Sequence, residues 1–140
     1  LDFDPSSDEN AQFSISMPKS WNLMNSYSNA AAFKFQSFYT VNGTNTGTVQ
    51  FRLSAVACSH DDTADVAFGA GYAPVAKAHT GTANDINASD IQGFQMAGTP
   101  ADGDIIFFNI MRDVSGDTQS ADVRLIGVKL FFATDKANDT

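Results

Sequence analysis

Apolar and polar residues alternate along much of this chain, which is the pattern of β-strands that bury one face. The alternation is regular in residues 11–17 and 48–58, and residues 32–40 are rich in Phe and Tyr, which favour strands. Residues 42–47 read Asn-Gly-Thr-Asn-Thr-Gly and predict a turn, because Asn and Gly accept positive φ angles. We therefore expect the strands at 32–40 and 48–58 to form a hairpin.

Two longer apolar runs lie in the last third of the chain. Residues 104–114 and 123–134 contain many β-branched and aromatic side chains, and clusters of Asp, Gly and Ser bound each run. The polar residues 115–121 separate them. This arrangement predicts two neighbouring strands that pair antiparallel in the middle of a β-sandwich.

The remaining segments predict short elements. A short helix is expected over residues 61–68, with Asp61 or Asp62 as its cap and glycines after its last turn. Residues 81–90 predict a loop, residues 91–97 a strand and residues 98–104 a tight connection.

Together these elements predict an all-β fold, an antiparallel and jelly-roll-like β-sandwich of about seven to eight strands with one short helix. A chain of 140 residues is long enough to bury a core of its own. We expect residues 1–140 to be a single domain. Because the chain starts at Leu1 within an acidic segment and without a Met, we expect it to be the C-terminal part of a longer protein.

The charge of the chain argues against two classes of partner. The net charge is −8, the isoelectric point is near 4.3, and the eight Lys and Arg residues never form a run. Nucleic acid and anionic membranes both attract basic surfaces, so neither is an expected partner. No apolar stretch approaches the roughly 18 residues that cross a bilayer, so no membrane insertion is expected. Charged residues make up only 17%, and the uncharged polar residues in their place favour a surface that meets other subunits.

Acidic clusters offer weak metal-binding chemistry. One imidazole and three carboxylates lie close together in the sequence: His60, Asp61, Asp62 and Asp65. Such groups can bind a divalent cation, but no ligand loop of known spacing accompanies them, so we favour a solvated loop with a helix cap. Residues 102–104 and 113–117 resemble fragments of calcium loops without the final Glu, and we interpret them as turns. We predict no metal and no cofactor.

The sequence contains no catalytic motif. Cys58 is the single Cys and lies in an apolar stretch, where Cys is usually a small core residue. His79 lies in a stretch that we expect to be exposed, with no nucleophile placed beside it. We predict that the chain is not an enzyme.

Two further sets of side chains have structural and functional interpretations. Charged residues stand near the facing ends of the two long strands, which predicts cross-strand ion pairs among Arg112, Asp113, Asp122 and Arg124. Flat rings with a polar edge suit glycans, so a glycan or receptor contact is considered for Trp21, Tyr27 and Tyr72, and also for Tyr39. Core filling or subunit contact is the other interpretation of these rings.

Four motifs carry a resemblance to a known family. They read LDFDPSSDENAQF at residues 1–13, MPKSWN at 17–22, AGTPADGDI at 97–105 and RLIGVKLFFATDKAND at 124–139. In order and wording they resemble the C-terminal domain of a family of small proteins encoded in tailed-phage and prophage genomes. The resemblance spans almost the whole chain.

The resemblance implies a non-catalytic virion structural protein of a bacteriophage. It implies a β-sandwich displayed on the particle as a homotrimer, serving as a capsid decoration, a head fibre or a tail-associated protein such as a tail fibre. The implied partners are further copies of the chain and other capsid or tail proteins. The alternative function is a glycan-binding or receptor-binding adhesin module that contacts a host surface glycan.

Overall fold

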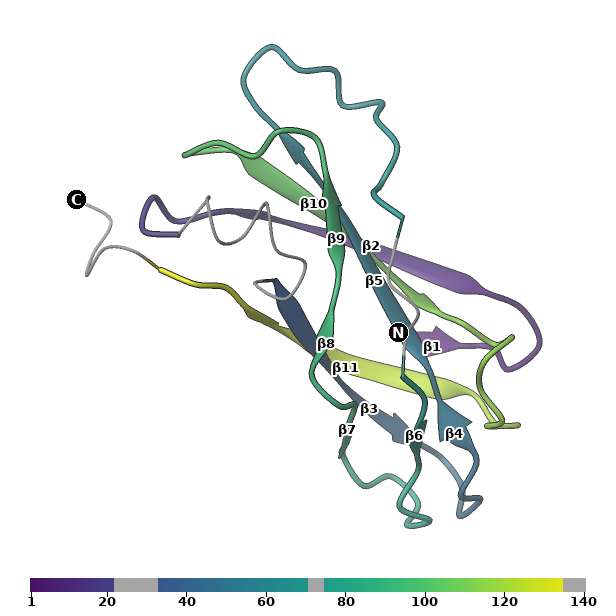
Figure 1. The fold of residues 1–140 in the computed structure, drawn as a ribbon. Coiled ribbons are helices and arrows are strands. Elements are labelled where there is room, and N and C mark those ends of the chain that lie inside the picture. The colour runs from purple at the N-terminus through teal and green to yellow at the C-terminus, as the bar shows by residue number, and fades with distance from the viewer. Residues whose placement is uncertain (22–32, 71–74, 135–140) are drawn as a thin grey trace.

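The computed structural model describes residues 1–21, 33–70 and 75–134 of the chain. Within these residues the chain forms strands and no helix, and the longer strands build two sheets that face each other as an open sandwich (Figure 1). The prediction of an all-β, antiparallel sandwich is therefore confirmed.

The strands are divided between two main sheets and one small one. Sheet A has the order β1 (Asp2–Phe3), β11 (Val123–Phe131), β3 (Lys34–Val41) and β7 (Asn87–Ala88), and β8 (Gln92–Gly93) also pairs with β3. Sheet B has the order β2 (Glu9–Ser16), β10 (Ile105–Arg112), β5 (Phe51–Cys58) and β9 (Gln95–Ala97). The small sheet consists of β4 (Thr48–Val49) and β6 (Lys77–Ala78).

The two long C-terminal strands do not pair with each other. β10 is hydrogen-bonded between β2 and β5 in sheet B, whereas β11 lies between β1 and β3 in sheet A. The predicted pairing of residues 104–114 with residues 123–134 is therefore wrong. The connection over residues 113–122 carries the chain across the sandwich, so the two strands become the inner strands of opposite sheets.

The predicted hairpin is wrong for the same reason. β3 belongs to sheet A and β5 to sheet B, so the turn at residues 42–47 also crosses the sandwich. Two other connections donate hydrogen bonds to backbone carbonyls at the end of this turn. The His79 N–H donates to the Gly47 carbonyl at 3.1 Å, and the Thr118 and Gln119 N–H groups both donate to the Thr48 carbonyl at 3.0 Å.

Six strands follow the order of a jelly roll. β1, β2, β3 and β5 alternate between the sheets, and β10 and β11 then insert between β2 and β5 and between β1 and β3. The departure lies between β5 and β10, where the chain first contributes β7 and β8 to sheet A. β9 then joins β5 in parallel rather than antiparallel.

Residues 61–68 form a loop and not the predicted helix. All of them except the half-buried Phe68 are exposed, so a helix here would have no apolar face to pack against the core. The carboxylate of Asp62 accepts the Ser59 N–H at 2.8 Å and so closes a turn at the start of this loop.

Aromatic side chains fill the centre of the sandwich. Phe94 interrupts the predicted strand at residues 91–97 because its ring enters the core, which leaves β8 and β9 as separate short strands. The Phe94 ring centre lies 5.4 Å from that of Phe33 and 5.8 Å from that of Phe108. Trp21 packs against Phe33 at 5.4 Å, and Phe35 of β3 lies 6.4 Å from Phe94, so rings from both sheets and from the connections pack together.

A buried arginine at the end of β10 joins the two sheets. Arg112 has no exposed side-chain surface, and its Nε lies 2.7 Å from the carboxylate of the equally buried Asp117. The guanidinium also donates to backbone carbonyls of sheet A and of the β10–β11 connection, namely those of Phe3 at 2.9 Å, Gln119 at 2.6 Å and Ala121 at 3.1 Å. The ion pairs predicted among the strand-end charges are therefore wrong, since Asp113 binds Arg52 and Arg124 binds Asp2 instead.

Replacing Arg112 by Met is expected to lower the free energy of unfolding by about 3–5 kcal/mol, because it leaves the Asp117 carboxylate buried without a partner. Urea unfolding measures the loss. Arg124→Met is the matched control, since its partner Asp2 is half exposed and water replaces the lost contact. Equal losses in the two variants would contradict the role given to Arg112.

Ionisation of Tyr39 is expected to lower the free energy of unfolding at alkaline pH. Its ring is fully buried, and burial together with the Asp90 carboxylate raises the pKa of Tyr39 to about 12. The pKa of Tyr in an unfolded chain is about 10, so the stabilisation is complete below pH 10 and disappears as the pH rises through the folded-state value. Between pH 9 and pH 11 the natural chain should lose about 1 kcal/mol more stability than Tyr39→Phe. Urea unfolding at both pH values tests this, and parallel losses in the two proteins would refute it.

Candidate binding surface

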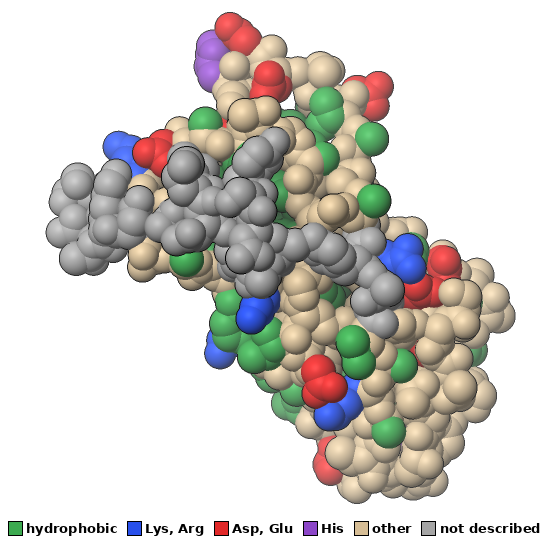
Figure 2. Space-filling model, viewed as in Figure 1, with side chains coloured by type: hydrophobic (Ala, Val, Ile, Leu, Met, Phe, Trp, Pro, Cys, Tyr) green, Lys and Arg blue, Asp and Glu red, His purple; other side chains and the backbone are tan. Residues whose placement is uncertain are grey.

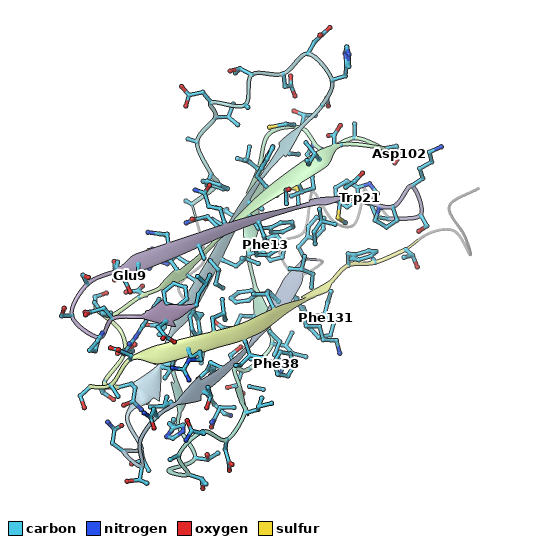
Figure 3. The ribbon with its side chains drawn as sticks, turned by 180° about the vertical axis from the view of Figure 1, so that it is seen from behind. Glu9, Phe13, Trp21, Phe38, Asp102 and Phe131 are labelled. Carbon is cyan, nitrogen blue, oxygen red and sulfur yellow. The ribbon has the colours of Figure 1, made fainter. Side chains whose placement is uncertain are left out.

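The sandwich is open along one side, between β2 of sheet B and β11 of sheet A. Figure 3 looks onto this side, with β2 and β11 as its two rims and Phe13 on the upper one. We call the depression between them the β2–β11 groove. Its volume is about 220 Å³, and it is lined by Leu1, Ala11, Gln12, Phe13, Ile110, Leu125, Gly127 and Val128. The groove is therefore mostly apolar.

The first rim, β2, is an edge strand of sheet B. It runs for eight residues, and all eight pair with β10 on its inner side. Glu9 is its one charged residue, and it contains no Pro. Natural edge strands are commonly protected by Lys, Pro, bulges or short length, and β2 has none of these. Among the described residues no strand pairs with its outer edge, so the N–H and C=O groups there are open to another strand.

The second rim is the part of β11 that lies beyond β1. β1 pairs only with Val123 and Arg124, and the Leu125 N–H donates to the Leu1 carbonyl at 2.8 Å. From residue 126 to 131, no other described residue pairs with β11 on this side. A bulge between Leu125 and Gly127 leaves Ile126 54% exposed.

A turn after β1 explains why the groove is open. The N–H and hydroxyl groups of Ser6 both donate to the Asp4 carboxylate, and these hydrogen bonds lower the pKa of Asp4. The Asp4 N–H in turn donates to the carboxylate of Glu9, where β2 begins. This turn moves the chain from sheet A to sheet B after only two residues of β1, so β11 continues without a neighbour.

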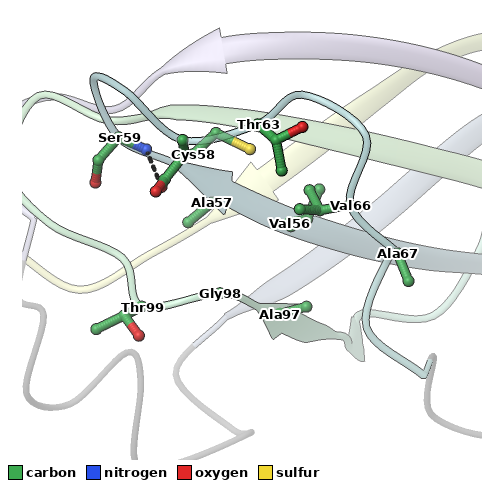
Figure 4. Close-up of a pocket in the computed structure, with 11 residues that line it drawn as sticks. Val56, Ala57, Cys58, Ser59, Thr63, Val66, Ala67, Ala97, Gly98 and Thr99 are labelled. Carbon is green, nitrogen blue, oxygen red and sulfur yellow. Dashed lines mark hydrogen bonds between the residues drawn. The ribbon is translucent and has the colours of Figure 1, made fainter.

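A second cavity, of about 420 Å³, lies beneath the loop that follows β5 (Figure 4). Cys58 lines it, and burial raises the pKa of this thiol, which keeps it protonated and weakly nucleophilic. Gly98 closes the cavity in a left-handed conformation with φ 81°, and a Cβ there would lie 2.5 Å from the Ala57 carbonyl oxygen. The interpretation of Cys58 as a small core residue agrees with its 6% exposure.

The acidic residues singled out from the sequence take structural roles or stand in solvent. Figure 2 shows acidic side chains and a histidine on the protruding loop, where His60 and Asp61 are almost fully exposed. Asp104 accepts the Ser59 hydroxyl at 2.7 Å and the Ala101 N–H at 2.7 Å, which closes the turn before β10. Among the residues that the structure describes, no three His, Cys, Asp or Glu side chains gather as a metal site would require.

His79 is buried and not exposed as predicted. Its side chain is 2% exposed, and its Nδ1 lies 2.8 Å from the Asn45 carbonyl oxygen. The turn at residues 42–47 covers the imidazole. The polar residues next to His79 in the sequence give no sign of this distant contact. It has no described nucleophile as a hydrogen-bond partner.

The structure places the aromatic candidates in different environments. Trp21 is 1% exposed and packs against Phe33, so its indole fills the core and presents no face to a glycan. Tyr39 is likewise buried. Tyr27 and Tyr72 lie outside the described residues.

Comparison with protein-family models, with curated proteins and with solved structures found no match to this chain. No helix in the described parts of the chain is long and apolar enough to cross a membrane.

The sequence pattern did not indicate the groove residues as one set, because they lie far apart along the chain, in the first strands, in β10 and in β11. The one available signal was the absence of charged residues and of Pro over residues 10–16.

Proposed function

We propose that this chain is a virion structural protein of a tailed phage, displayed on the particle as a capsid decoration, head fibre or tail-associated protein. It acts through self-assembly and surface binding and performs no catalysis. The observation that carries the proposal is the β2–β11 groove, where two open strand edges flank an apolar floor. Strand edges and apolar patches of this kind are the surfaces on which chains assemble.

The family resemblance supports the same function. Of its four motifs, the one at residues 1–13 forms β1 and the first part of β2, and the one at residues 124–139 begins with β11. The two rims of the groove therefore come from the motifs that carry the resemblance. The low fraction of charged residues, 17%, also suits a protein whose surface meets other subunits.

The alternative function, a glycan-binding adhesin, gains no support from the aromatic residues that the structure describes. Trp21 is in the core. On the outer face of sheet A the Lys129 Nζ lies 4.9 Å from the centre of the Phe131 ring, so a cation already occupies that ring face.

Purified phage particles from a host that carries this coding sequence are expected to contain the chain in many copies. An antibody raised against the chain should label regular positions on the particle surface in electron micrographs, because a displayed sandwich is accessible. An antibody against a non-virion protein of the same phage serves as the control. Abundant chain in the infected-cell lysate with none on purified particles would overturn the proposal.

A further inference from the structure

We propose that a second copy of this chain covers the β2–β11 groove, with β2 against the partner's β2 and β11 against the partner's β11 about one two-fold axis. This contact rests on the proposed self-assembling function and names its partner, and it has two-fold symmetry in place of the homotrimer that the family resemblance implies. Each sheet then continues from one copy into the other, and the apolar floors of the two grooves face each other.

The direction of the rims makes this contact possible. β2 and β11 run the same way along the groove, as the positions of Glu9, Trp21 and Phe131 show in Figure 3. A two-fold axis perpendicular to both strands reverses the partner's strands, so both new pairs are antiparallel. An antiparallel pair satisfies the outer N–H and C=O groups of each rim with regular hydrogen bonds. One operation therefore pairs both edges, as an isologous dimer requires.

The charges on the rims permit two copies to meet, although each copy carries a net charge of −8. β2 has only Glu9, at its end, so the antiparallel pairing places the two Glu9 side chains at opposite ends of the contact. Between residues 126 and 131 the one charged residue of β11 is Lys129, whose Nζ lies over the Phe131 ring on the outer face of sheet A and not on the groove floor. The acidic loop at residues 60–65 lies elsewhere, beyond the end of β5 (Figure 1).

The size of the contact is that of a weak, concentration-dependent interface. The β2 rim of eight residues is roughly 26 Å long and the β11 rim of six residues roughly 20 Å, and sheets roughly 10 Å apart give a contact roughly 20 Å wide. Each copy then buries roughly 450 Å², or roughly 900 Å² for the pair, which is in the range of transient association. Leu1, which lines the groove, is an exposed apolar residue, and so are Ile15 on the β2 rim and Ile126 on the β11 rim, next to the contact.

Light scattering over a range of protein concentrations tests the proposal. The natural chain should have twice the monomer mass of 14.9 kDa at high concentration. Ile15→Lys and Ile126→Lys place a charge on each rim and should reduce the mass to that of the monomer. Ile91→Lys is the matched control, because Ile91 is 53% exposed against 54% for Ile126 but lies away from the groove, and it should remain a dimer.

A cross-linking measurement covers the case in which a Lys variant fails to fold. Gln12→Cys on the surface of β2 should be joined to its counterpart in a second copy by a short bis-maleimide, since paired strands lie roughly 5 Å apart. Ile91→Cys should not be joined. A monomer at every concentration, a trimer, or a dimer that persists in both rim variants and resists cross-linking at residue 12 would each overturn this contact. None of these outcomes affects antibody labelling of particles, so failure of the contact and failure of the proposed function are distinguishable.

Discussion

The fold depends on one buried guanidinium. Arg112 ends β10, and its hydrogen bonds reach β1, Asp117 and the connection that leads to β11. A charge without exposed surface is stable only when its N–H groups are paired, so these contacts fix where the chain crosses from sheet B to sheet A. They also hold β1 against the beginning of β11. The β2–β11 groove begins where this short β1 ends, so the candidate binding surface is a consequence of the same anchoring.

The alternation of side chains predicts which residues face the core but not which strands are neighbours. In β10, Ile106, Phe108 and Ile110 are buried in strict alternation, as the sequence pattern indicates. Strand partners are decided by the two crossing connections, at residues 42–47 and 113–122. These are held by contacts distant in sequence, such as the Thr118 N–H on the Thr48 carbonyl, which leave no local signal. A segment rich in turn residues has the same composition whether it closes a hairpin or connects the two sheets of a sandwich.

The candidate site was less predictable than the fold. Its lining joins Leu1, Phe13, Ile110 and Val128, which only the sheet order brings together. The residues that attracted a chemical interpretation were those with distinctive side chains, and of the described ones Trp21 and His79 are buried in the fold. The Trp21 ring suits a core as well as a glycan, and packing decides between them. Absence of charge and Pro over residues 10–16 was the clearest sign of the rim, yet an inner strand has the same composition.

The central claim is that open strand edges at the groove join copies of this chain. Amide hydrogen exchange at two protein concentrations tests it most directly, because it reads the backbone groups themselves. The N–H groups on the outer side of β2, and those of β11 at residues 126–131, should exchange more slowly in the concentrated sample, whereas β9, at the other edge of sheet B, should be unchanged. Equal exchange of β2 at both concentrations would contradict the claim.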